Sequence, residues 1–172
     1  METKTIYIIR HGEKSDDEKN LTKKGKRQSE CLADRLKKLN ITKIYSSDLQ
    51  RCKETAEIIQ KKLRLPINYK KALREVPRRI KEQPKRNKKE IKILRNFWNK
   101  IDKSRRNLLL VSSGIVNRIL ISFALNIDSP KANFMQYPTG LTKIEKIKKN
   151  RYRIGYINDT SHLPNKLKMI QN

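Results

Sequence analysis

The sequence has few cysteines, few acids and no long apolar run. Its 172 residues include two cysteines, Cys31 and Cys52, whose spacing fits neither a zinc site nor a disulfide framework. We therefore expect a reducing compartment, and by default a cytoplasmic protein. No apolar run approaches the roughly 20 residues of a membrane span. The first run, Ile6–Ile9, is too short for the core of a secretory signal, so no signal peptide is predicted.

Bases greatly outnumber acids in this chain. There are 43 Lys and Arg residues against 17 Asp and Glu residues, which gives a formal net charge of +26. The excess is concentrated in residues 74–106, with 14 bases and four acids, and in residues 143–153, with six bases and one acid. Such clusters are typical of surfaces that bind RNA or another polyanion, and equally of a solvated lysine-rich surface. Phe97 and Trp98 are expected on an apolar helix face, so base stacking is not predicted.

Short apolar runs alternate with amphipathic segments along the chain. Runs of β-branched and aromatic residues predict strands at 5–9, 41–46, 67–69, 108–111, 141–147 and 152–157. Apolar residues at helical spacing predict four helices, which begin after Thr22, after a cap at Ser47–Asp48, near Asn87 and beyond a turn at Gly114. This order predicts an α/β fold, a three-layer α/β/α sandwich around a mainly parallel sheet. We expect a single domain over residues 1–172.

Polar residues follow three of the predicted strands. They are Arg10-His11-Gly12-Glu13, then Ser46-Ser47-Asp48 with Arg51 one turn later, and Ser112-Ser113-Gly114. Ligands of an open α/β sheet bind beyond the carboxyl ends of its strands. Guanidinium groups and helix N-termini favour an oxyanion such as phosphate there. The histidine is then a nucleophile or an acid–base group, and the alternative interpretation is an ordinary surface histidine in a loop.

Five segments, in chain order, carry a family resemblance. They are residues 10–13 after a short apolar strand, 21–28 with its leucine-threonine, glycine and glutamine, 45–56 with its serine-serine-aspartate-leucine, arginine and threonine-alanine, 109–118, and the tail at 158–163. Together they resemble the histidine phosphatase superfamily, the phosphoglycerate mutase-like proteins. The resemblance spans nearly the whole chain and implies the phosphoglycerate mutase-like fold.

The resemblance also implies a mechanism and its residues. His11 would attack phosphorus and carry a transient phosphohistidine. Arg10 and Arg51 would hold the phosphoryl oxygens, and Glu75 would protonate the leaving group. Neither a metal nor another cofactor is implied, because the arginines supply the positive charge. Without the family, Glu75 is interpreted as an exposed loop carboxylate.

One position departs from the family pattern. The second histidine of the family corresponds to position 113, where this chain has Ser113, followed by Gly114 at the phosphate site. Serine donates one hydrogen bond but carries no charge. Losing one charged donor from a preorganised oxyanion site costs about 2–4 kcal/mol in the transition state, a rate loss of roughly a hundred- to a thousand-fold. A slow phosphatase, a pseudophosphatase that still binds phosphate and an engineered replacement of histidine all fit this serine. His162 is expected to be a structural hydrogen-bonding residue of the tail.

A small phosphatase is the better family match than a full mutase. Residues 14–18 lack the asparagine with which mutase-type members help to hold phosphate, and the acids Asp16, Asp17 and Glu18 are expected to point to solvent. We therefore expect a phosphomonoester hydrolase acting on a phosphorylated substrate. The alternative is an impaired relative that binds phosphate, or RNA through its basic surface. Substrate identity would depend on the loop at 70–86, which carries no motif.

Overall fold

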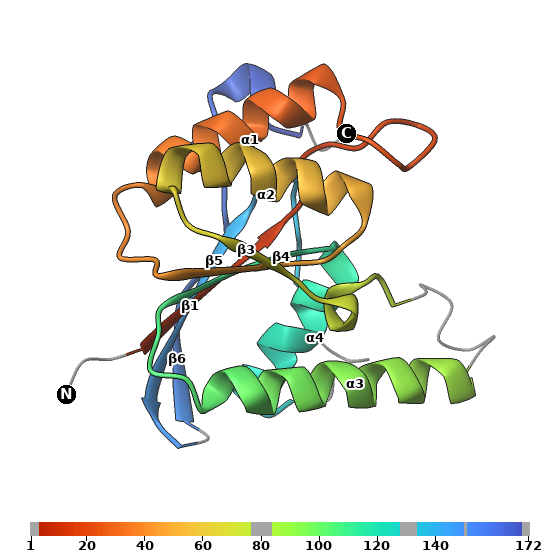
Figure 1. Ribbon diagram of the computed structural model, residues 1–172, viewed down its shortest axis with the longest axis vertical. Coiled ribbons are helices and arrows are strands. Elements are labelled where there is room, and N and C mark those ends of the chain that lie inside the picture. The colour runs from red at the N-terminus through yellow and green to blue at the C-terminus, as the bar shows by residue number, and fades with distance from the viewer. Residues whose placement is uncertain (1–3, 77–83, 128–133, 150, 170–172) are drawn as a thin grey trace.

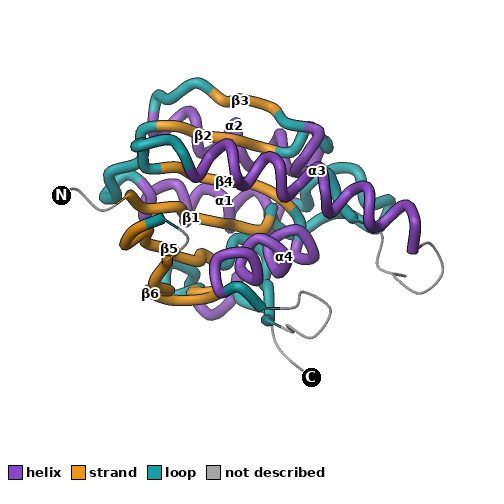
Figure 2. Tube along the Cα trace, turned by 90° about the horizontal axis from the view of Figure 1, so that it is seen from below, coloured by secondary structure: helices purple, strands orange, loops and turns teal. Residues whose placement is uncertain are grey.

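Six strands form one mixed sheet in this computed structural model, which describes residues 4–76, 84–127, 134–149 and 151–169, with side chains in α3 from residue 88 onward. The strands are β1 (Lys4–Arg10), β2 (Lys43–Ser46), β3 (Ile67–Tyr69), β4 (Leu108–Ser112), β5 (Leu141–Lys148) and β6 (Arg151–Asp159). Their order across the sheet is β3-β2-β4-β1-β5-β6, which can be followed from top to bottom in Figure 2. The first four in that order pair in parallel, and β5 and β6 are antiparallel.

Helices cover both faces of the sheet. Helices α1 (Lys23–Leu36) and α2 (Gln50–Leu63) lie on one face, and α3 (Pro84–Asp102) and α4 (Gly114–Leu125) lie on the other (Figure 1). Two short 3-10 turns, η1 (Lys71–Leu73) and η3 (Asn165–Leu167), follow β3 and β6. The predicted three-layer α/β/α sandwich around a mainly parallel sheet is therefore confirmed. Within the described ranges, no helix combines the length and the apolar composition that a bilayer crossing requires.

The central strands divide the core into two layers. Successive side chains of a strand point to opposite faces. In β1, Ile6 and Ile8 pack towards α3 and α4, whereas Tyr7 and Ile9 pack towards α1 and α2. All four are buried, as are the residues of β4. Burial on both faces explains why these two strands read as continuous apolar runs.

Helix starts differ in detail from the sequence-based prediction. The predicted cap at Ser47–Asp48 is wrong, because α2 begins at Gln50 and its N-cap residue is Leu49, without a side-chain cap. Asp48 instead pairs with Arg74, at 2.7 Å. Helix α3 begins at Pro84 rather than near Asn87, because proline has no N–H to lose and its φ suits a first helical position. Thr22 is the N-cap of α1, as predicted.

Candidate active site

The carboxyl ends of three parallel strands bring the predicted site residues together. Arg10 at the end of β1 pairs with Ser112 at the end of β4, and the His11 N–H donates to the Ser112 carbonyl at 3.0 Å. The Ser47 N–H, just beyond β2, donates to the Val111 carbonyl at 2.9 Å. These bonds extend the ladder past the strand ends. Residues 11, 47 and 113 therefore leave the sheet at the same edge.

His11 is buried and held in one tautomer. Its side chain is 3% exposed, and its Nδ1 lies 2.7 Å from the Gly12 carbonyl oxygen. A carbonyl only accepts, so Nδ1 carries the proton and Nε2 keeps its lone pair. Burial lowers the pKa of His11 from 6.5 to about 3, and the nearby Arg10 and Arg51 cations also lower it, against the Gly12 hydrogen bond. The ring is thus a neutral imidazole with its basic nitrogen at Nε2.

Arg51 is the residue that faces this nitrogen. It lies in the first turn of α2 and is only 7% exposed. Its Nε–H donates to His11 Nε2 at 3.1 Å, and one Nη donates to the Glu18 carbonyl at 2.9 Å. The other Nη contacts the Glu75 carboxylate at 2.5 Å. The guanidinium plane is therefore fixed on three sides next to the candidate nucleophile.

Glu75 lies at the rim of the site rather than in its interior. Its side chain is 38% exposed, against 9% for that of its partner Arg51. The solvent-facing expectation for the acidic loop is confirmed, since the side chains of Asp16, Asp17 and Glu18 are exposed. The Glu18 backbone has a further role that was not predicted: its carbonyl accepts from Arg51, and its φ is 60°. Residues 77–83 of the predicted specificity loop lie outside the described residues.

The Arg10 side chain is held by a residue that is far from it in the sequence. One of its Nη atoms donates to the Gln136 carbonyl at 2.7 Å. The Gln136 side chain is buried and accepts from Asn117 of α4 at 3.0 Å, and Asn117 in turn accepts from the Ser112 hydroxyl. Sequence reasoning missed Gln136, since residues 134–140 have no motif, and the contact spans 126 positions.

Ser113 and Gly114 stand where the chain turns from β4 into α4. Gly114 is the first residue of α4, not part of a preceding turn as predicted, and Ser113 is the N-cap residue. The Ser113 hydroxyl makes no capping bond, and it has no hydrogen-bond partner among the described residues although the residue is 2% exposed. A Cβ on Gly114 would lie 3.7 Å from Cδ of Arg10. The N-terminus of α4 thus adjoins the Arg10 side chain, and the buried Ser113 hydroxyl belongs to the residue just before it.

Two buried polar side chains anchor the turn after β1. The Gly12 N–H donates to the Thr55 hydroxyl at 3.1 Å, and that hydroxyl donates to the Arg51 carbonyl at 2.9 Å. The Glu13 N–H donates to Gln28, whose amide donates to the Leu167 carbonyl of η3, both at 2.8 Å. Both side chains are fully buried. The family segments contained both residues, but only the fold reveals these contacts.

A close approach explains the glycine of the signature. A Cβ on Gly12 would lie 2.5 Å from the Gly25 carbonyl oxygen, which is closer than a real Cβ contact allows. The His11 loop therefore lies directly against the start of α1.

His162 lies outside the site, in the tail. Its Nδ1 is 3.5 Å from Arg35 and its Nε2 is 3.4 Å from the Thr139 hydroxyl. Burial, with Arg35, lowers its pKa to about 4. The Thr139 N–H donates to the Arg10 carbonyl at 3.0 Å, so the tail histidine supports the site only indirectly.

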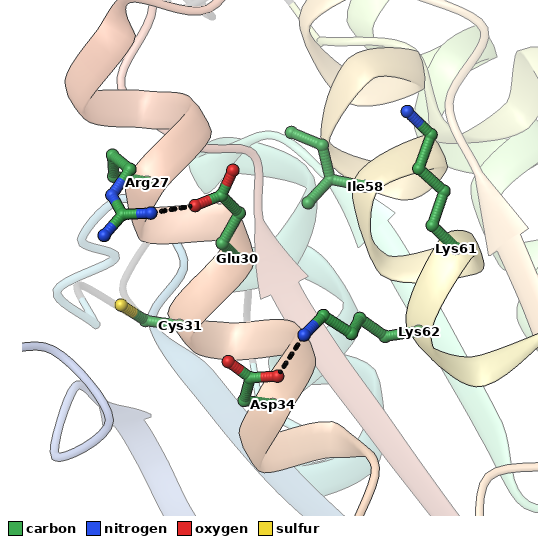
Figure 3. Close-up of a pocket in the computed structure, with 7 residues that line it drawn as sticks. All are labelled: Arg27, Glu30, Cys31, Asp34, Ile58, Lys61 and Lys62. Atoms are coloured by element: carbon green, nitrogen blue, oxygen red, sulfur yellow. Dashed lines mark hydrogen bonds and ion pairs between the residues drawn. The ribbon is translucent and has the colours of Figure 1, made fainter.

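The groove of Figure 3 is separate from these residues. It measures about 440 Å³, lies between α1 and α2, and has Cys31 and Ile58 among its lining residues. Two ion pairs, Arg27–Glu30 and Lys62–Asp34, line it. None of the predicted site residues lines this groove. Over the described ranges, no group of three or more His, Cys, Asp or Glu side chains is arranged to hold a metal ion.

Comparison with known families decides the assignment. The histidine phosphatase superfamily (branch 1) matches residues 6–100, which is more than half of the chain and includes Arg10, His11, Arg51 and Glu75. The chain belongs to the histidine phosphatase superfamily. Ser113 lies beyond the matched residues of this histidine phosphatase family member.

A curated relative supports the same family over part of its length. "Probable phosphoglycerate mutase GpmB" of Salmonella choleraesuis is 36% identical over 87 aligned positions, which cover 45% of this chain and 40% of the relative. The chain therefore matches 40% of the length of that curated relative.

Three solved structures share the fold of this chain over most of their length. A mycobacterial glucosyl-3-phosphoglycerate phosphatase is 17% identical with a TM-score of 0.73, covering 91% of this chain and 99% of that chain. Bacillus stearothermophilus YhfR is 22% identical with a TM-score of 0.75, covering 92% and 98%. A phosphoserine phosphatase from Entamoeba histolytica, solved with 3-phosphoglyceric acid, is 19% identical with a TM-score of 0.71, covering 94% and 100%.

Proposed function

We propose that this protein hydrolyses phosphomonoesters through a transient phosphohistidine on His11. The observation that carries the proposal is the neutral, buried His11 ring, fixed through Nδ1 on the Gly12 carbonyl with Nε2 3.1 Å from Arg51. A neutral imidazole attacks without first losing a proton, and a fixed ring attacks from one direction. Phosphatases among the structural neighbours support the same reaction class.

In the first step, Nε2 attacks phosphorus, a P–N bond forms, and the P–O bond to the leaving group breaks. The phosphoryl oxygens take over the Arg51 donors that now reach His11 and Glu75. Glu75, released from Arg51 by the bound phosphoryl group, would act as the general acid of this step. Its proton goes to the leaving oxygen. In the second step, water attacks phosphorus, Glu75 takes a water proton, and the P–N bond breaks to release inorganic phosphate and neutral His11.

Positive charge and oriented N–H groups would stabilise the transition state. Arg10 and Arg51 supply two guanidinium groups, and Gly114 begins helix α4, whose free N–H groups favour an anion. The Ser113 hydroxyl, buried without a described partner, would donate one further hydrogen bond to a phosphoryl oxygen. It brings no charge, so we propose slow turnover compared with a histidine at this position.

Hydrolysis of an aryl phosphate by three proteins tests the proposal. The unchanged protein should turn over slowly, and Ser113→His should be roughly a hundred- to a thousand-fold faster. His11→Ala should abolish both hydrolysis and an acid-labile phosphoryl adduct, detected by mass spectrometry of the quenched enzyme. Vanadate affinity of the unchanged protein provides the binding control.

Two results would contradict the hydrolase proposal. Hydrolysis that survives His11→Ala would come from elsewhere. Vanadate binding without hydrolysis, in both the unchanged protein and Ser113→His, would instead identify a phosphate-binding pseudophosphatase.

A further inference from the structure

The exposed side of α3 carries charge of one sign. The exposed charged side chains between residues 88 and 106, here called the basic face, are Lys88, Lys89, Lys92, Arg95, Lys100, Lys103, Arg105 and Arg106. The two acids of this stretch, Glu90 and Asp102, are half-buried. The Asp102 carboxylate forms an ion pair with Lys146 at 2.7 Å and accepts a hydrogen bond from the Tyr152 hydroxyl at 2.6 Å. Among the described residues, no ion pair involves a member of the basic face.

Helical spacing arranges part of the basic face in a row. Lys88, Lys92 and Arg95 follow one another at four and three residues, and Lys103 continues the row just past the helix end. At 1.5 Å per residue, the row is about 22 Å long. The Arg95 guanidinium is held in place over the Phe123 ring, 3.3 Å from its centroid.

The β5–β6 hairpin extends the charge beyond the helix. Lys146 and Tyr152 both contact Asp102, so the end of this hairpin lies beside the C-terminus of α3. Lys148, Lys149 and Arg151 are exposed there. Other bases of segment 143–153 are not available in the same way, because Lys143 and Arg153 both pair with Glu145 at 2.8 Å.

Repulsion between the like charges of this row destabilises α3 when no anion is bound. Like charges at i,i+3 and i,i+4 repel by about 0.2–0.5 kcal/mol per pair, and Lys92 alone has three such neighbours, Lys88, Lys89 and Arg95. Helix α1 offers a contrast, since its exposed Arg27 pairs with Glu30 three residues later at 2.6 Å. A long anion with regularly spaced charges would relieve the repulsion along α3.

We propose that the basic face binds the phosphodiester backbone of a nucleic acid, with RNA as its partner, without sequence preference. Phosphates contacted by lysines release their condensed counterions, which drives binding. Phe97 and Trp98 of α3 are buried, so no aromatic ring of the described helix residues is available to stack on bases. Among the described side chains of α3, Ile93 is the single exposed large apolar residue, and the adjoining hairpin adds Ile147, which is too little to insert into a bilayer.

Salt dependence gives the proposal a quantitative form. If the basic face neutralises about five phosphates of a single strand, log affinity falls against log salt with a slope of about −3.5. Affinity for a 20-nucleotide RNA of mixed sequence should therefore drop roughly a hundred-fold between 50 and 200 mM salt.

Two fourfold variants with the same net charge test where binding occurs. One reverses exposed residues of the basic face: Lys88→Glu, Lys92→Glu, Lys100→Glu and Lys103→Glu. The matched control reverses exposed lysines of the α1/α2 side: Lys26→Glu, Lys37→Glu, Lys38→Glu and Lys61→Glu. We expect the first variant to bind RNA more than ten-fold more weakly at 50 mM salt with a nearly flat slope, and the control to remain within about three-fold of the unchanged protein. Circular dichroism checks the fold of both.

Three results would overturn the proposal. Equal losses in the two variants would mean that net charge, not this face, governs binding. No RNA binding at 50 mM salt would mean that the face is only solvated. Tight binding to phosphatidylserine vesicles with no RNA binding would identify a membrane surface instead. His11→Ala should leave RNA binding unchanged, and a loss there would place the RNA in the phosphate site.

Discussion

Arg51 and Lys92 are both cations on helices, but their surroundings differ in every respect. Arg51 is 7% exposed and its guanidinium meets His11, Glu18 and Glu75. Lys92 is exposed, three of its four helical neighbours at three and four residues are cations, and no described residue pairs with it. A cation fixed in a dry site acts on one bound group at full strength, whereas an exposed cation is screened within about 10 Å at 0.1 M salt. Positive charge therefore suits catalysis at the candidate active site and salt-sensitive binding of an anion on the basic face.

The largest expected difference between the two regions is in catalysis. Arg51→Ala should lower kcat/KM for an aryl phosphate about a thousand-fold, because it removes a preorganised donor from the phosphoryl group. The fourfold reversal of the basic face should change it less than about two-fold at 0.15 M salt, because those charges are exposed and screened. Steady-state kinetics in the Ser113→His background, where turnover is highest, measures both. Comparable losses would show that long-range attraction, not contact, is what the site requires.

Acid should lower the free energy of unfolding through the buried His11, whereas the lysines and arginines of the basic face stay charged. The pKa of His11 is lowered from 6.5 to about 3, so below pH 6.5 the unfolded chain binds a proton that the folded one does not. His11 therefore contributes stability that is fully present above pH 6.5 and is lost as the pH falls towards 3. The loss of unfolding free energy between pH 7 and pH 5 should be about 2 kcal/mol larger in the unchanged protein than in His11→Asn. His11→Asn keeps the contribution of His162, whose pKa is lowered to about 4. Urea unfolding at the two pH values measures it. The same loss in both proteins would assign the effect to other groups.

The sequence predicts the parts of the site that follow strands. Arg10, His11 and Ser113 each come directly after or at the end of an apolar run, and the edge of a parallel sheet brings such residues together. Arg51 is predicted by the same logic, one turn into the next helix.

Contacts that depend on how loops fold back could not be predicted. The Gln136 carbonyl that holds Arg10 lies 126 residues away in a segment without a motif. The Glu18 carbonyl reaches Arg51 through a left-handed turn in a loop whose acids predicted only exposure. Likewise, the sequence shows that two segments are rich in bases. Only the fold shows that Lys143 pairs with Glu145 whereas Lys92 has no such partner among the described residues. Residue types do not show which backbone carbonyl a side chain will reach or which charged residue it will pair with.

Thr55→Val should destabilise the site region by removing one hydroxyl. The buried Gly12 N–H would lose its acceptor, and an unsatisfied buried donor costs about 1–3 kcal/mol. Valine keeps the shape, and Thr55→Ser keeps the hydroxyl, so the pair separates hydrogen bonding from packing. We expect the loss in urea unfolding for Thr55→Val only, with weaker vanadate binding because Thr55 links the Gly12 turn to the Arg51 carbonyl. Equal stability of the two variants would show that packing is what matters at Thr55.

The smallest expected effect has the opposite sign. Lys92→Glu should stabilise the protein by about 1 kcal/mol at low salt, because it turns repulsion from Lys88, Lys89 and Arg95 into attraction. Lys92→Gln should give roughly half of that gain. Urea unfolding at 50 mM and 500 mM salt measures it, and screening should remove the difference at the higher concentration. The same substitution should weaken RNA binding, so the charge that binds the proposed partner is one that the fold itself disfavours. If Lys92→Glu lowers stability at 50 mM salt, the row on α3 is not repulsive, and its argument for an anionic partner fails.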